Sequence, residues 1–244
     1  MRTLHEAGLT DRVRLGVPVP PVRGAPGSPG SPFNRKPSNP GTEENAFSPD
    51  ALLRPTALRE GRLIEVCGEI SSGRTALAYR MAAGATTRGE LVGWIDLPNS
   101  LDPRFLMRAG VDLEGVLWVR PPELRAALRS AELLLKTGFA VVTLDLEGAS
   151  PRALGKMGTS VWSRLLRAVR ESRATALVLG SERAVGSFAT QSLHTERQRA
   201  RFEAGLFEGL DNRATLLRDR TGPADRVCDF RLEHRSPKRV APGT

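Results

Sequence analysis

The sequence predicts an α/β domain in which helices flank a mainly parallel sheet, with an antiparallel hairpin at its C-terminal end. Two observations predict this fold class. From about residue 57 to residue 179, apolar segments of strand length alternate with segments that have one apolar helical face. Beyond them, two further strand-like segments flank Gly222-Pro223, a pair typical of a turn. Parallel strands joined by helices are covered on both faces, so we expect helices on both sides of the sheet.

The expected strands are short apolar runs that end in turn residues. The first is Arg62–Cys67, and Gly68 begins the turn that follows it. The same pattern predicts strands at 91–95, 116–119, 139–146 and 174–179, and the hairpin strands at 214–218 and 226–232.

The expected helices repeat apolar residues every three or four positions. The segment 75–83 presents Leu77 and Met81 on one face, and Asp102 caps a helix that has Pro103 in its first turn. Two longer helices are predicted at 122–136 and 161–172.

The first 55 residues differ in composition from the rest. Ten of the residues from Gly16 to Pro55 are proline, mixed with glycine and serine, and such a segment buries too little apolar surface to fold. The preceding segment, Met1–Leu15, would form a stable helix only when docked. We therefore expect a disordered arm or linker at 1–55 and one domain at 56–244.

The composition argues against several classes of protein. The longest apolar runs are strand-sized, so no transmembrane helix is expected, and Met1–Val22 has no apolar core of a signal peptide. Two cysteines, Cys67 and Cys228, cannot form a disulfide framework, and the three histidines are isolated from other metal ligands. These features predict a cytoplasmic protein that does not contact a membrane.

The formal net charge of +9 is concentrated at the C-terminal end. Residues 150–244 carry 18 basic and 10 acidic residues, a balance of +8, whereas residues 51–149 carry 12 of each. A basic surface favours a polyanionic partner such as a nucleic acid. The alternative is a compositional bias, because 32 of the 36 basic residues are arginine.

A candidate phosphate-binding loop follows the first strand. Residues 68–75 have the spacing G-x-x-x-x-G-K-[ST] between a strand and a helix, with arginine in place of lysine. Glycines let backbone N–H groups face a phosphate, the helix start adds a positive dipole, and the threonine hydroxyl would hold Mg²⁺. The alternative is a turn that merely retained its glycines. The expected nucleotide-binding residues of this loop are Gly68, Ser71, Ser72, Gly73, Arg74 and Thr75.

Three short sequence segments follow this loop: Ile95-Asp96, Leu101-Asp102-Pro103 and Ala109-Gly110-Val111-Asp112-Leu113. The fourth predicted strand ends in Leu144-Asp145. With these segments, the run from Gly61 to Asp145 resembles the core ATPase domain of the RecA recombinase family. The resemblance implies a RecA-like phosphate-loop core, with ATP and Mg²⁺ as cofactors. It fades after Glu147, and the chain shows no counterpart of the family's C-terminal domain. In this respect the chain is similar to the short ImuA family of RecA-like accessory proteins in bacterial translesion synthesis.

The resemblance assigns further nucleotide contacts to individual residues. It implies that Asp145, together with Thr75, orders the magnesium ion, and that Asp102 and Phe105 hold the adenine. From the residues alone, Asp102 is equally well a helix cap and Phe105 a core residue.

Two positions that the family uses for hydrolysis are altered. Pro98 stands where the resemblance places the catalytic glutamate, and Ser181 where it places the glutamine that senses the γ-phosphate. Proline has no ionisable group and cannot act as a general base. Together with Arg74, these changes predict ATP binding with little or no hydrolysis.

The resemblance also implies single-stranded DNA binding by the segment after the fifth strand. Arginines with aromatic neighbours suit phosphate contacts and base stacking, whereas the alternative is a solvated helix at 195–204. The expected DNA-binding residues are Arg183, Arg197, Arg199 and Arg201. Arg218 and Arg220 match a pair that would reach the nucleotide of a neighbouring subunit, or they are charges that protect an edge strand.

Three functions remain open at this point. The first is a DNA-repair scaffold whose partners are single-stranded DNA, RecA and error-prone polymerase subunits, with or without homo-oligomerisation. The second is an active DNA-dependent ATPase, for which Glu69 is the one candidate base. The third is a SulA-like cell-division inhibitor, which would have no affinity for DNA.

Overall fold

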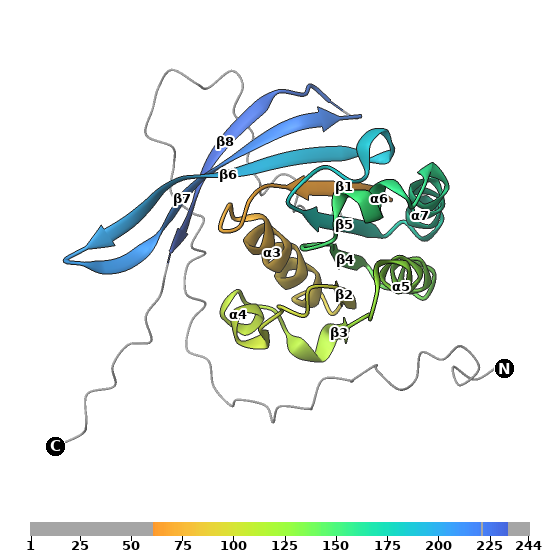
Figure 1. Cartoon of the computed structure of the whole chain (residues 1–244). Helices are drawn as coiled ribbons and strands as arrows, with labels where there is room; N and C mark the ends of the chain where they lie inside the picture. Colours follow the sequence, from red (N-terminus) through yellow and green to blue (C-terminus); the bar gives the residue numbers. More distant parts are fainter. Residues whose placement is uncertain (1–60, 221, 234–244) are drawn as a thin grey trace.

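The computed structural model describes residues 61–220 and 222–233 (Figure 1). The predicted arm at 1–55 lies outside the described residues, and the domain limits of 56–244 therefore stay a prediction. The described strands form one sheet in the order β3-β2-β4-β5-β1-β6-β7-β8. Neighbours from β3 to β6 are parallel, whereas β6–β7 and β7–β8 are antiparallel pairs. The predicted fold class is confirmed.

The strands are β1 (Arg62–Cys67), β2 (Val92–Asp96), β3 (Val116–Val119), β4 (Val141–Asp145), β5 (Thr175–Gly180), β6 (Gln191–Glu203), β7 (Leu206–Asp219) and β8 (Arg226–Glu233). The helices are α3 (Arg74–Thr86), α4 (Pro103–Arg108), α5 (Leu124–Lys136), α6 (Pro151–Gly155) and α7 (Thr159–Ser172), with short 3₁₀ turns η3 (Leu113–Gly115) and η4 (Gly186–Phe188). Strands β1 and β3 match their predicted bounds, and α6 was not predicted. No helix among these is long and apolar enough to cross a membrane.

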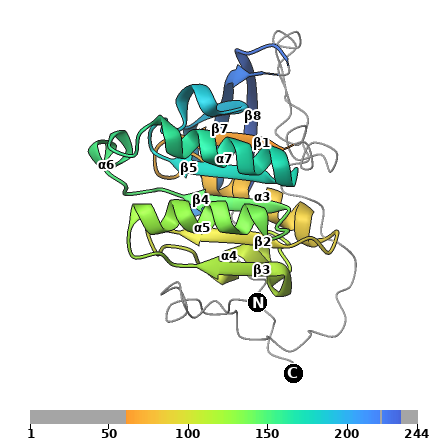
Figure 2. The same ribbon diagram turned by 90° about the vertical axis from the view of Figure 1, so that its right-hand side faces the viewer.

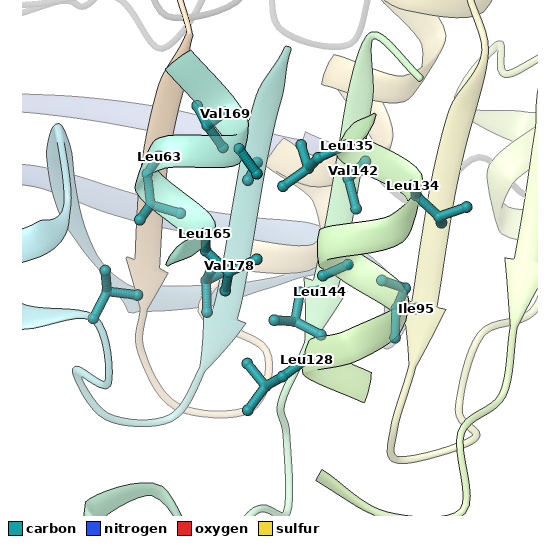
Figure 3. Close-up of a cluster of buried hydrophobic side chains, with 14 of the residues drawn as sticks. Leu63, Ile95, Leu128, Leu134, Leu135, Val142, Leu144, Leu165, Val169 and Val178 are labelled. Carbon is teal, nitrogen blue, oxygen red and sulfur yellow. The ribbon is translucent and has the colours of Figure 1, made fainter. Parts of the chain in front are cut away.

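Helices cover both faces of the parallel part of the sheet, as expected. Figure 2 shows α5 and α7 on one face and α3 and α4 on the other. Under α5 and α7, Leu128 and Leu165 pack toward Leu63, Leu144 and other buried side chains of the strands (Figure 3). Burial of these apolar surfaces is the main stabilising contribution to the fold.

The core on the other face includes the last three strands. Leu77 and Met81 of α3 share a buried cluster with Leu193 of β6, Leu216 of β7 and Phe230 of β8. The C-terminal antiparallel strands therefore pack against the helix that follows the phosphate loop, which fixes their position beside that loop.

The helix considered as an alternative at 195–204 is not formed, whereas the DNA binding expected of the segment after β5 stays a prediction. Neither a loop nor a helix occupies 195–204, because β6 runs to Glu203 and forms a long hairpin with β7 that projects from the body of the domain (Figure 1). Ala204 and Gly205 connect the two strands with φ of 48° and 79°, the positive values that a type I′ turn needs. Near the tip of this hairpin, residues 196–200 and 202–207 are exposed, so a strict alternation of apolar and polar residues is not required there.

Candidate nucleotide-binding site

The phosphate loop lies between β1 and α3, as predicted. Ser71 and Gly73 adopt positive φ of 66° and 93°, and the N–H of Ser72 donates to the carbonyl of Glu69 at 3.1 Å. Gly73 is the N-cap of α3 and supplies no side-chain hydrogen bond to the first helical turn. The N–H groups at the start of α3 therefore lack a side-chain cap, which is the arrangement that binds an anion.

The back of this loop rests on the antiparallel strands. The hydroxyls of Ser72 and Thr195 are 2.8 Å apart, and the side-chain amide of Asn212 donates to the carbonyl of Ser71 at 3.4 Å. A Cβ added to Gly68 would lie 2.2 Å from the carbonyl oxygen of Thr195. Strands β6 and β7 thus hold the loop in place, and the first glycine is required for their close approach.

Arg74 is buried and paired with a carboxylate, Glu147, that was not among the predicted site residues. One arm of its guanidinium donates to the carbonyl of Gly68, and the other forms an ion pair with Glu147. The hydroxyl of Ser181 lies 3.0 Å from both carboxylate oxygens of Glu147. Glu147 follows Asp145 by two residues at the end of a strand, and that position was the signal available in the sequence.

Asp145 ends β4 at the same sheet edge as the phosphate loop, beside its register partner Asp96. Burial raises the pKa of Asp145 to about 6, with a further increase from Asp96 and Glu147, against the Glu147 N–H and the Arg74 guanidinium. A buried carboxylate of this kind is favourable in its ionised form when a cation lies beside it.

The residues present fit a magnesium ion that is bound together with phosphates. Thr75 and Asp145 would supply a hydroxyl and a carboxylate oxygen, which are ligands that Mg²⁺ prefers. Among residues 61–220 and 222–233, no three His, Cys, Asp or Glu side chains gather into a metal-binding group. Mg²⁺ in such a site keeps water and phosphate ligands in place of an all-protein cage.

The two residues expected to hold adenine lie at the start of α4 and within it. Asp102 is the N-cap, and its carboxylate accepts from the N–H of Arg104 at 2.9 Å, which confirms the helix-cap interpretation. Hydrogen bonds from the side chain and the backbone of Arg104 lower the pKa of Asp102. Phe105 is 50% exposed, with the Arg108 guanidinium over its ring, so its interpretation as a core residue was wrong. The adenine contact of both residues stays a prediction.

Pro98 lies in a wall of an open cavity of about 440 Å³ at the ends of β2 and β4. Glu147 is the one ionisable residue in its lining, which otherwise consists of Leu97, Pro98, Leu124, Gly148, Ala149 and Ala153. Glu69, the base considered from the sequence, is exposed on the phosphate loop.

The predicted DNA-binding arginines fall into two groups. Arg183 lies in the segment after β5, where its guanidinium is 3.5 Å from the buried carboxylate of Glu65. Arg197, Arg199 and Arg201 lie on β6 in the hairpin, and Arg201 is 3.7 Å from both Glu208 and Asp211. Arg197 and Arg199 are exposed on either side of a register shift.

Glu65 is a second carboxylate that was not among the predicted site residues. It is buried on β1, and one oxygen accepts from the N–H groups of Ala184 and Val185 at 2.6 Å each. Its other oxygen accepts from the hydroxyl of Ser192 at 3.2 Å. Glu65 therefore fixes the segment between β5 and β6, which includes Ser181.

Arg218 and Arg220 lie at the C-terminal end of β7. Arg218 is the register partner of Ser192, and the guanidinium of Arg220 donates to the carbonyl of Ser187. Their role between subunits stays a prediction.

Cys67 does not resemble a reactive thiol. Cys67 is buried at the end of β1, where burial raises its pKa, and it lies 3.6 Å from the Nδ1 of His194. Cys228 is partly buried on β8. A raised pKa reduces the thiolate fraction that nucleophilic chemistry needs.

Comparison with known proteins agrees with this geometry. The model of the family described as RecA N-terminal domain matches residues 46–169, just over half of the chain. The RecA protein of Chelativorans sp. (strain BNC1) is 38% identical over 116 residues, which are 46% of this chain and 32% of that protein. The RecA protein of Frankia casuarinae is 36% identical over 115 residues, which are 46% of this chain and 33% of that protein. The chain thus spans about a third of the length of these curated relatives.

The fold is also similar to a solved structure. The crystal structure of the RadB recombinase superposes with a TM-score of 0.55 at 20% sequence identity, covering 70% of this chain and 87% of the other. This likeness concerns the fold alone. On the evidence of the family match, with its phosphate loop and strand-end aspartate in place, the chain belongs to the RecA N-terminal domain family.

Proposed function

We propose that this protein is a RecA-like accessory factor of DNA repair, of the ImuA type, that binds nucleotide and single-stranded DNA and hydrolyses ATP little or not at all. It would act as a scaffold for RecA or for error-prone polymerase subunits. One observation carries the proposal: the phosphate loop and Asp145 lie at one sheet edge, whereas Pro98 stands where the resemblance to the RecA family places the base.

The other carboxylates of the site support weak hydrolysis. Asp96 is fully buried and accepts from the N–H groups of Ser100 and Leu101 and from the indole of Trp118. Glu147 is engaged by Arg74 and Ser181. A general base must reach the attacking water, directly or through one further water. Both carboxylates would first have to give up the hydrogen bonds that hold them.

The DNA-binding part of the proposal rests on charge and on the family. Residues 150–244 carry the basic excess of the chain, and Arg197 and Arg199 are exposed on the hairpin. Contacts of this kind bind the backbone phosphates independently of base sequence and weaken as salt is added.

Equilibrium binding of a fluorescent ATP analogue to the full chain tests the nucleotide site, with and without single-stranded DNA. We expect Mg²⁺-dependent binding that Thr75→Ala abolishes, with phosphate release no faster than in the Thr75→Ala control. Phosphate release that DNA stimulates and Asp145→Ala removes would instead establish an active ATPase. Absence of binding of both this analogue and ADP would refute this part of the proposal.

The DNA site is tested by fluorescence anisotropy with a labelled single strand at several salt concentrations. Neutralising both Arg197 and Arg199 to glutamine is expected to reduce the salt slope by about 1 to 2. Arg129→Gln, which removes an exposed charge from α5, is the matched control and should leave the slope unchanged. A wild-type protein without DNA affinity would contradict the proposal and favour a cell-division inhibitor.

A further inference from the structure

The guanidinium of Arg74, the basic residue of the phosphate loop, is paired with the carboxylate of Glu147. The side chain of Arg74 is only 7% exposed, and its ion pair with Glu147 joins the start of α3 to the segment after β4. Ser181, from the segment after β5, adds a hydroxyl at 3.0 Å from each oxygen of the same carboxylate. Three segments of the sheet edge therefore meet at Glu147.

The Glu147 carboxylate contacts Arg74 where a phosphate group of a bound nucleotide would contact it. In a loop with this spacing, the basic residue after the second glycine reaches the β- and γ-phosphates of a bound nucleotide. A guanidinium binds carboxylate and phosphate through the same forked geometry. Glu147 thus offers Arg74 the anionic oxygens that a phosphate group would otherwise offer.

We propose that the Glu147 carboxylate substitutes for the terminal phosphate of a nucleoside triphosphate, so that this site selects nucleoside diphosphates. This inference rests on the nucleotide binding proposed above. A diphosphate can use the backbone N–H groups of the loop and Thr75 while the Arg74–Glu147 pair stays intact.

A triphosphate meets two obstacles at the same place. It must take Arg74 from Glu147, and it then brings further negative charge beside a carboxylate whose side chain is only 26% exposed. Asp145 and Asp96 are further carboxylates near this end of the site. Like charges placed together in a partly buried site oppose binding.

The test compares the affinities of fluorescent ADP and of a fluorescent, non-hydrolysable ATP analogue for the full chain in Mg²⁺. We expect the wild type to bind the diphosphate about tenfold more tightly, and Glu147→Gln to abolish or reverse this preference. Glu182→Gln removes an exposed glutamate next to Ser181 and should leave the ratio unchanged. Ser181→Ala removes one partner of Glu147 with little structural change and should reduce the ratio partially.

The outcomes separate this inference from the proposed function. Equal affinities in the wild type, or a ratio that Glu147→Gln leaves unchanged, would overturn the selection of diphosphates while nucleotide binding stands. Binding of the triphosphate by Glu147→Gln alone would support the inference. Absence of binding of either nucleotide by the wild type and by Glu147→Gln would refute nucleotide binding itself, and the inference with it.

Discussion

Gly73 faces the ring of Phe230 so closely that a Cβ on Gly73 would lie 2.7 Å from the Cζ atom of that ring. Gly73 belongs to the phosphate loop and Phe230 to the last strand, 157 residues further along the chain. The C-terminal strand is therefore part of the packing that shapes the phosphate loop.

This contact predicts that Gly73→Ala is strongly destabilising. The alanine would have to adopt φ near 93° and displace Phe230 or the Asn212 amide, which together should cost about 3 kcal/mol of unfolding free energy. Urea denaturation measures this loss. The matched control is Gly84→Ala in α3, where the nearest atom to a new Cβ is 3.6 Å away. The control should stabilise the protein by about 0.5 kcal/mol, and a similar loss in both variants would contradict the contact.

Glu65 and Arg183 form an ion pair, but the two residues should contribute differently to the free energy of unfolding. Removing Glu65 leaves the buried N–H of Val185 and its neighbour Ala184 without an acceptor, so Glu65→Ala should cost about 3 kcal/mol. The side chain of Arg183 is 44% exposed, and its Nε lies 3.5 Å from the Glu65 carboxylate. Arg183→Ala should therefore cost less than about 1 kcal/mol. Hydrogen exchange should also show lost protection between β5 and β6 in Glu65→Ala only. Equal costs would show that the charge, and not the backbone hydrogen bonds, stabilises this segment.

The raised pKa of Asp145 predicts that the free energy of unfolding falls as pH rises. Its pKa is about 6 in the folded protein, against 3.8 as the ordinary value, so between these values the folded state binds more protons than the unfolded state. The stability contributed by the protonated form is complete below pH 3.8 and is lost as pH rises through 6. Asp145→Asn should therefore raise the unfolding free energy by about 3 kcal/mol at pH 7 and leave it nearly unchanged at pH 3.5. Thermal unfolding at both pH values, without Mg²⁺ or nucleotide, checks this prediction, which a pH-independent difference would contradict.

The backbone of Ala204 at the tip of the β6–β7 hairpin predicts that replacing this residue increases the free energy of unfolding. Ala204 holds φ of 48°, a conformation that glycine and asparagine adopt at lower cost than alanine. Ala204→Gly and Ala204→Asn should each stabilise the protein by about 0.5 kcal/mol, as measured by chemical denaturation. Replacing Gly205, which has φ of 79°, by alanine should destabilise it. A loss of stability in Ala204→Asn would argue against this turn.

The first five strands could be predicted from the sequence, whereas the β6–β7 hairpin could not. Strands β1 to β5 were predicted within a few residues because each is an apolar run with a glycine, a charge or a helix cap at its ends. The β6–β7 hairpin was missed because its projecting half has Glu196, Arg197 and Arg199 on exposed positions, and its turn lacks the usual Asn-Gly signal. Its strands are specified by cross-strand pairing, such as the ion pairs of Arg201 on β6 with Glu208 and Asp211 on β7.

The sequence by itself determined the α/β fold class and the phosphate-loop spacing at 68–75, because these depend on local spacing and residue type. That Pro98 stands in the place of a catalytic base is what the resemblance to the RecA family implies. Only the tertiary structure decided the partner of Arg74. Glu147 lies 73 residues away, and the two meet because parallel strands bring their carboxyl ends to one edge of the sheet. The order of the strands, rather than any local pattern, therefore sets the charge beside the phosphate loop.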